Sequence, residues 1–243
     1  SQSIWGYETN YGAFAEFTKV RASQLIRKPS RLDWSIASSF CLTLSTAYRM
    51  LISKNGVQLK AGDTCLIWGG AGGLGSFGIQ LCKLSGANVI ATVSGDEKAA
   101  IANDAGADLI INYRDDDVVT AVKDFTNGHG VDRILEVEFG GNLSVSKEVI
   151  KPNGTIAAYG SVAVMEPSLP FYDFMFKGVK LNTYLIYIVS ESDRSSIING
   201  LNRAMDDGAL QHLVTQTYAL DEIIDAHESM ESNQVIGNIV VQI

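Results

Sequence analysis

The chain has 243 residues, a net charge of −8 at pH 7, and 46% hydrophobic and 19% charged residues. This is the composition of a globular protein of one or two domains, and it excludes a disordered chain. The acidic balance and the lack of a Lys/Arg cluster argue against a nucleic-acid partner. No apolar run reaches membrane-spanning length, and the N-terminal SQSIWGYETN has no signal-peptide pattern, so we expect a cytoplasmic protein. Cys41, Cys65 and Cys82 are odd in number and irregularly spaced, which argues against a disulfide framework. None of them sits in a CxxC pair, which argues against a structural zinc lobe.

From Thr64 onward, apolar strand-like runs alternate with runs of helical period. The expected strands are 64–68, 88–93, 109–112, 132–136, 154–159 and the run from Lys180 to Ile188. The expected helices are 74–85, 97–105, 117–125, 143–150 and 194–207. This alternation predicts an α/β fold, a doubly wound parallel sheet with helices on both faces.

The two ends of the chain have a different pattern. Residues 12–20, GAFAEFTKV, alternate with a period of two, as a half-buried strand does. Near the C-terminus, 214–219 and 236–243 are strand-like and flank a helix expected at 220–231. We expect these ends to meet in a second, smaller unit, and residues 162–170 to form an irregular surface loop.

The stretch WGGAGGLG, residues 68–75, follows the first strand of this alternation and opens a helix. Gly70, Gly72 and Gly75 fit G-x-G-x-x-G, the dinucleotide fingerprint, and that strand-to-helix context is what the fingerprint requires. Glycines there permit a tight turn, close approach of backbone to a pyrophosphate, and close helix–strand packing. The helix N-terminus offers N–H groups and partial positive charge to phosphates. A glycine-rich turn without a ligand is the alternative.

The end of the second strand indicates which dinucleotide is bound. NAD-binding proteins usually place Asp or Glu there for the ribose 2′-OH, whereas this chain has Ser94, followed by Lys98. A hydroxyl and an ammonium suit a 2′-phosphate, so we favour NADPH, although Asp96 and Glu97 lie nearby. Tyr113 is a candidate to stack on the adenine side. A solvated Lys98 and a packing role for Tyr113 remain the alternatives.

The segments GAFAEF, LSTAYRML, LKAGDTCLIWGGAGGLG, GANVIATVSGDEK and GADLIINYRDDD, in this order, resemble the medium-chain dehydrogenase/reductase superfamily. Within it, the chain is similar to the zinc-independent quinone oxidoreductases and enoyl reductases, and its first half to crotonyl-CoA carboxylase/reductases. The resemblance implies a Rossmann-type dinucleotide-binding domain at 45–211. It also implies remnants of a GroES-like β-rich catalytic domain, with one part at 1–44 and a C-terminal return at 212–243. Family members carry a further stretch before the point where this chain begins.

Two departures from the family pattern concern chemistry. Zinc-bearing relatives place a cysteine four residues before the threonine that matches Thr46, where this chain has Leu42, so no metal site is expected. His129, His212 and His227 are widely spaced and fit no ligand pattern. Carboxylating reductases carry a histidine where this chain has Val137, although Glu8 matches another residue of their site.

The resemblance also implies roles for further residues. It places Thr46 beside the nicotinamide and brings Gly160, Ser161 and Asn238 to the cofactor, together with the loop residues Ala71, Gly73 and Leu74. It implies dimerisation through the edge strand at 180–188, with no membrane partner. The expected activity is NADPH-dependent, zinc-independent reduction of a conjugated acceptor: an enoyl thioester, an enone or a quinone. Reductive carboxylation and a non-catalytic dinucleotide-binding module or fragment are the alternatives.

Overall fold

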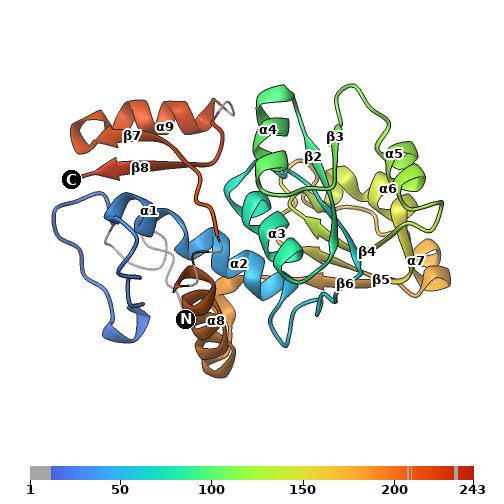
Figure 1. The fold of residues 1–243 in the computed structure, drawn as a ribbon, viewed down its shortest axis with the longest axis horizontal. Coiled ribbons are helices and arrows are strands. Elements are labelled where there is room, and N and C mark those ends of the chain that lie inside the picture. The colour runs from blue at the N-terminus through green and yellow to red at the C-terminus, as the bar shows by residue number, and fades with distance from the viewer. Residues whose placement is uncertain (1–11, 207, 209, 233–234) are drawn as a thin grey trace.

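The computed structural model describes residues 12–206, 208, 210–232 and 235–243. Its centre is a six-stranded, all-parallel sheet in the order β3-β2-β1-β4-β5-β6 (Figure 1). The strands are β1 (Thr64–Ile67), β2 (Asn88–Val93), β3 (Leu109–Asn112), β4 (Val131–Glu136), β5 (Ile150–Ala158) and β6 (Lys180–Thr183). The strand order reverses between β1 and β4, and such a switch point opens a crevice at the carboxyl ends of the strands.

Helices cover both faces of this sheet, as the alternation predicts. Successive strand residues point to opposite faces, so Ile67 and Leu135 join one core cluster while Leu66 and Ile134 join the other. The first cluster includes buried residues of α2 (Cys41–Leu51), α3 (Gly73–Leu84), α4 (Asp96–Asp104) and α8 (Glu191–Asp206). The second includes buried residues of α5 (Val118–Phe125), α6 (Phe139–Val149) and α7 (Phe171–Lys177). The predicted Rossmann-type fold is confirmed.

A second unit stands beside the sheet and is built from the C-terminal residues (Figure 1). There β7 (Val214–Ala219) and β8 (Asn238–Gln242) pair in parallel, with α9 (Ile223–Glu231) as the crossover between them. The short α1 (Trp34–Ser39) packs against both strands. A bridge between Gly72 and Gly237 ties this unit to the glycine-rich loop, so the C-terminal return lies at the edge of the crevice.

The strand expected at 12–20 is wrong. These residues form bends and irregular structure, and Phe14 and Phe17 are 58% and 88% exposed. An alternating segment becomes a strand only when a neighbouring strand takes its hydrogen bonds and its apolar face, and within the described residues no strand lies against it. The apolar side chains Phe14 and Phe17 are therefore left largely in solvent, as is Leu25 further along the chain.

The strand expected from Lys180 to Ile188 is also wrong in its second half. β6 ends at Thr183, which pairs with Ala158, the last residue of β5. Beyond that point β5 has no residue to pair with, and the chain turns into a 3-10 helix at Ile186–Ile188. Ile186 is buried against the core under α2 and α8, which accounts for the apolar composition that suggested a longer strand.

No helix within the described part of the chain is long and apolar enough to cross a membrane. The other predicted helices and strands are present with ends shifted by a few residues, and residues 162–170 form the expected irregular loop.

Candidate dinucleotide-binding site

A cleft of about 290 Å³ opens at the carboxyl end of the sheet, above the switch point between β1 and β4. Its lining includes most of the predicted cofactor residues: Ala71, Gly72, Gly73, Leu74, Gly75, Ser94, Lys98 and Tyr113. Residues far apart in the sequence are thus brought together in one place, because the ends of parallel strands meet at one edge.

The floor of the cleft is the turn from β1 into α3. Gly69 has φ +71°, a left-handed conformation that glycine adopts readily. A Cβ on Gly75 would lie 2.1 Å from the carbonyl oxygen of Gly69, so only glycine allows this close approach of loop and helix. No side chain caps the N-terminus of α3 at Gly72, which leaves the first N–H groups of the helix open to a ligand.

The individual glycines do not all play the expected parts. The left-handed turn is at Gly69, which the fingerprint match does not include. Gly70 lies behind the cleft, where a Cβ would come within 2.8 Å of the Cβ of Ala91 on β2. Close packing of α3 on the sheet is made by Gly78, facing Leu135. The glycine run pointed to the turn, but spacing alone could not assign each glycine.

Ser94 and Lys98 meet at one end of the cleft, where the Lys98 ammonium donates a hydrogen bond of 3.1 Å to the Ser94 hydroxyl. Tyr113, 48% exposed, lines the same part of the cleft. No carboxylate belongs to the cleft lining within the described residues. Asp96 and Glu97 lie in the first turn of α4, a favourable place for negative charge.

The other end of the cleft contains residues that the sequence reasoning did not select as binding residues. Val137 follows β4 and Tyr159 follows β5, and both line the wall there. Thr92 of β2, two residues before Ser94, also lines the cleft. Thr92 is fully buried and supports the glycine turn, because its hydroxyl accepts from the N–H of Gly69 and its carbonyl from the N–H of Gly70. Their position at strand ends was the available signal.

Glu136, the last residue of β4, is fully buried below this wall. Its carboxylate accepts hydrogen bonds from the Glu138 N–H (2.8 Å), the Asn142 amide (2.8 Å) and the Ser146 hydroxyl (3.1 Å). Ser146 in turn accepts from the Trp68 indole N–H, at the start of the glycine-rich loop. Burial raises the pKa of Glu136, and these three hydrogen bonds oppose that rise. The network joins β1, β4 and α6 under the cleft.

Besides Gly70, four described residues of the predicted site lie outside the lining of the cleft. The Thr46 hydroxyl donates to the Leu42 carbonyl within α2 (2.8 Å), a hydrogen bond inside the helix that gives it no role in the cleft. Ser161 accepts from the Gly140 N–H (3.0 Å) and thereby orders the loop after β5. Gly160 packs so tightly that a Cβ on it would lie 2.6 Å from the Val137 carbonyl oxygen. The Asn238 side chain packs against Gly73, where an added Cβ would lie 2.8 Å from the Asn238 Oδ1. Glu8 lies outside the described residues.

Among the residues that the structure describes, no group of three His, Cys, Asp or Glu could hold a metal ion. His212 instead lies between the rings of Phe40 and Phe77, and His227 contacts the ring of Phe14. The donor set of this part of the chain therefore does not fit zinc.

Comparison with known proteins finds dehydrogenases and reductases. The family described as zinc-binding dehydrogenase matches residues 73–198. Crotonyl-CoA reductase of Streptomyces avermitilis is 31% identical over 96% of this chain and 56% of its own length. The 2-haloacrylate reductase of Burkholderia sp. is 32% identical over 95% of this chain and 70% of its own. A solved structure of a variant of crotonyl-CoA carboxylase/reductase AntE in complex with NADP superimposes with a TM-score of 0.86, at 28% identity, over 100% of this chain and 65% of that one.

The chain thus spans little more than half the length of the crotonyl-CoA reductase that it matches. The match nevertheless covers 96% of this chain, and therefore nearly all of the alternating region and the C-terminal return. On these grounds the chain belongs to the medium-chain dehydrogenase/reductase superfamily.

Proposed function

We propose that the chain binds NADPH in the cleft above β1 and β4, and that it reduces a conjugated acceptor without zinc. The observation that carries this proposal is the pairing of an uncapped helix N-terminus with the Ser94–Lys98 pair in one cleft. The first suits a pyrophosphate and the second a 2′-phosphate.

The residues of the chain then have defined tasks. The open N–H groups of α3 hold the pyrophosphate, and Lys98 with Ser94 holds the 2′-phosphate. Tyr113 covers the adenosine end, while Val137 and Tyr159 border the nicotinamide end. Bound NADPH supplies a hydride, and the acceptor class follows from that chemistry: an α,β-unsaturated acyl thioester, an enone or a quinone offers an electron-poor carbon.

Two related proteins support this class of acceptor. The names of the relatives are crotonyl-CoA reductase and 2-haloacrylate reductase, and both describe reduction of a carbon–carbon double bond next to a carbonyl group. We place simple reduction ahead of reductive carboxylation because Val137, an aliphatic residue, lies on the cleft wall where carboxylating relatives are expected to carry a histidine.

Two copies of the chain are proposed to form a homodimer through β6. This strand is the last of the sheet, and within the described residues it pairs only with β5. An open strand edge presents N–H and C=O groups that a second copy can pair with.

The first experiment is a fluorescence titration of the purified chain with NADPH and with NADH in parallel. The proposal expects NADPH to bind at least about tenfold more tightly, the effect of roughly one charge-assisted contact. Equal binding of the two would contradict the role of Ser94 and Lys98. Binding of neither would favour the alternative, a fragment or non-catalytic module.

Turnover is tested next with crotonyl-CoA and with a quinone, each with and without bicarbonate. Oxidation of NADPH by either acceptor supports the reductase. A carboxylated product with crotonyl-CoA would instead establish the alternative that Val137 argues against. Binding of NADPH without any turnover would identify the described residues as the cofactor-binding part of a larger active site.

A further inference from the structure

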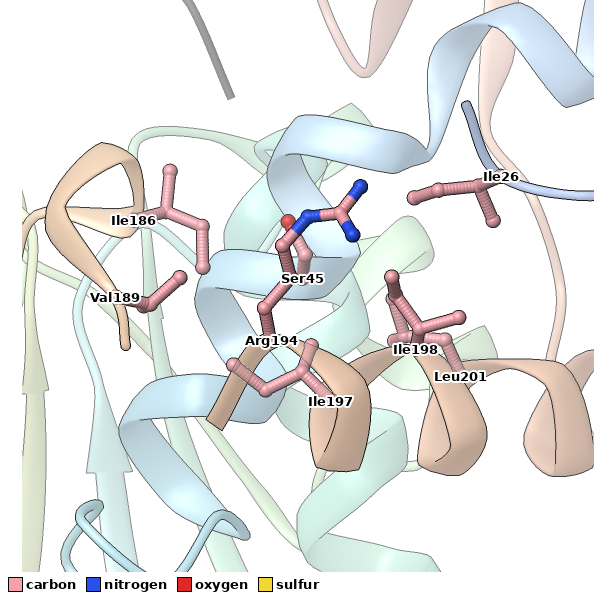
Figure 2. A pocket seen from close by; sticks show the side chains of 8 residues that line it. All are labelled: Ile26, Ser45, Ile186, Val189, Arg194, Ile197, Ile198 and Leu201. Atoms are coloured by element: carbon pink, nitrogen blue, oxygen red, sulfur yellow. The ribbon is translucent and has the colours of Figure 1, made fainter. Parts of the chain in front are cut away.

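A second pocket lies between α8 and α2, and it shares no lining residue with the cofactor cleft within the described chain (Figure 2). Most of its wall is aliphatic, formed by Ile26, Ile186, Val189, Ile197, Ile198 and Leu201. These residues come from the segment before α1, from the 3-10 helix after β6 with the residue that follows it, and from α8, so the tertiary fold rather than one element creates the pocket.

Two polar side chains, Ser45 and Arg194, complete the lining. The Ser45 hydroxyl already donates to the carbonyls of Cys41 and Leu42 inside α2. The Arg194 side chain rises from the first turn of α8, and its guanidinium ends among the aliphatic side chains next to Ser45 (Figure 2).

The Arg194 guanidinium has no ion pair or hydrogen bond to any described residue. Its acidic neighbour Asp193 is turned elsewhere and accepts a hydrogen bond of 2.7 Å from Asn55. Arg194 is partly buried, and its guanidinium offers paired N–H donors that match a carboxylate. A ligand with a single carboxylate therefore matches the polar side of this pocket.

The size of the pocket limits the rest of the ligand. The space is about 310 Å³ when its open mouth is counted, but the narrow interior is only about 20 Å³, near the size that holds one water molecule. The end of a short alkyl chain fits there, against Ile197 and Ile198, whereas a ring or a long chain does not.

We propose that this pocket is a binding site for a short-chain aliphatic carboxylate, with the carboxylate on Arg194 and the alkyl end in the aliphatic interior. The site is separate from the cofactor cleft and does not depend on the proposed reductase activity. The competing explanation is that the Arg194 stem merely covers apolar surface while its head group stays solvated.

The test is a titration of the isoleucine methyl-labelled chain with sodium butyrate at constant ionic strength, followed by NMR. Saturable shifts are expected at Ile197 and Ile198, with a Kd on the order of 1 mM for so small a ligand. Butanamide has the same shape without the charge, and it is expected to bind at least about tenfold more weakly.

Two variants localise the binding. Arg194→Gln is expected to weaken butyrate about tenfold or more, whereas Arg203→Gln, which removes an exposed cation from the same helix, leaves Kd unchanged. Ile198→Phe keeps the cation but fills the interior, and it is also expected to abolish binding. Thermal melts show whether each variant is folded, and Arg194→Gln alone decides the question if Ile198→Phe does not fold.

Three results would overturn the site. The first is an absence of saturable shifts at Ile197 and Ile198. The second is equal affinity for butyrate and butanamide, and the third is an unchanged Kd in Arg194→Gln. The last two would assign the pocket to plain apolar contact, with Arg194 as its solvated cover.

Discussion

The α-carbon of Gly75 faces the carbonyl oxygen of Gly69 so closely that a Cβ would lie 2.1 Å from that oxygen. The atom that this Cβ would meet belongs to the backbone of Gly69, so no flexible side chain can move away to make room. It fixes the distance between the end of β1 and the first turn of α3, and with it the shape of the proposed pyrophosphate site.

Gly75→Ala is therefore expected to shift the loop, to destabilise the chain by about 1–3 kcal/mol, and to abolish tight NADPH binding. Chemical denaturation and the fluorescence titration measure the two effects. Gly12→Ala is the matched control, because a Cβ there meets nothing within 4 Å. Unchanged affinity in Gly75→Ala would mean that the loop does not hold the pyrophosphate.

Lys98→Gln is expected to weaken NADPH about tenfold and to leave NADH nearly unchanged, because only the 2′-phosphate needs the ammonium. The two Kd values are obtained by the same titration. Lys60→Gln, which removes an exposed lysine from the loop before β1, controls for the change in net charge. An equal loss for both dinucleotides would place Lys98 at the pyrophosphate instead.

The Rossmann unit could be predicted because its signals are local. Each buried strand is a continuous apolar run, each helix has an apolar period, and the glycines mark the turn between the first pair. Ser94 and Lys98 lie in one cleft with the glycine-rich loop because the loop follows β1, Ser94 follows β2, and these two strands are neighbours in the sheet.

The predictions that were wrong or missing depend on contacts with other parts of the chain, which the pattern within one segment does not contain. GAFAEFTKV has a strand pattern, but the pattern does not say whether a neighbour is present. The apolar run after Thr183 continues into Ile186, and only the end of β5 decides where pairing stops. The Glu136 network likewise depends on Asn142 and Ser146 from the following helix, which no motif connects to it.

Glu136→Leu is expected to destabilise the chain by about 2–3 kcal/mol, because it leaves the buried Ser146 hydroxyl and the part-buried donors of Glu138 and Asn142 without their acceptor. Glu136→Gln, which keeps an acceptor oxygen, should lie within about 1 kcal/mol of the native chain at neutral pH. Urea denaturation gives both values. Equal losses in the two variants would show that the hydrogen bonds of Glu136 do not matter.

The difference in stability between Glu136→Gln and the native chain should depend on pH. Burial raises the pKa of Glu136 above its ordinary 4.5, so the contribution of this carboxyl to stability is complete below pH 4.5 and is lost as the pH rises through the higher pKa of the folded state. Glu136→Gln should therefore gain stability relative to the native chain on going from acid to neutral pH. A constant difference between the two would contradict the raised pKa.

His212 should make the chain sensitive to mild acid. Burial lowers the pKa of His212 below its ordinary 6.5, nearby Arg31 lowers it further, and Asp33 opposes them. The unfolded chain then binds a proton more readily, so stability falls as the pH drops below 6.5 through the lower pKa of the folded state. His212→Phe, which keeps the contacts with Phe40 and Phe77, should reduce this fall in thermal melts. His129→Gln, an exposed control, should retain it.

The proposed dimer makes a prediction about a single backbone group. The Tyr184 N–H donates to the Ala158 carbonyl of β5, and N–H groups alternate in direction along a strand, so the Thr183 N–H faces the open edge of β6. Thr183→Pro removes that donor without touching the pairing with β5. Light scattering should give twice the 26.2 kDa chain mass for the native protein and for Thr183→Val, and the single mass for Thr183→Pro. A native monomer, or a Thr183→Pro dimer, would exclude pairing through β6, because a dimer built on that edge needs the donor.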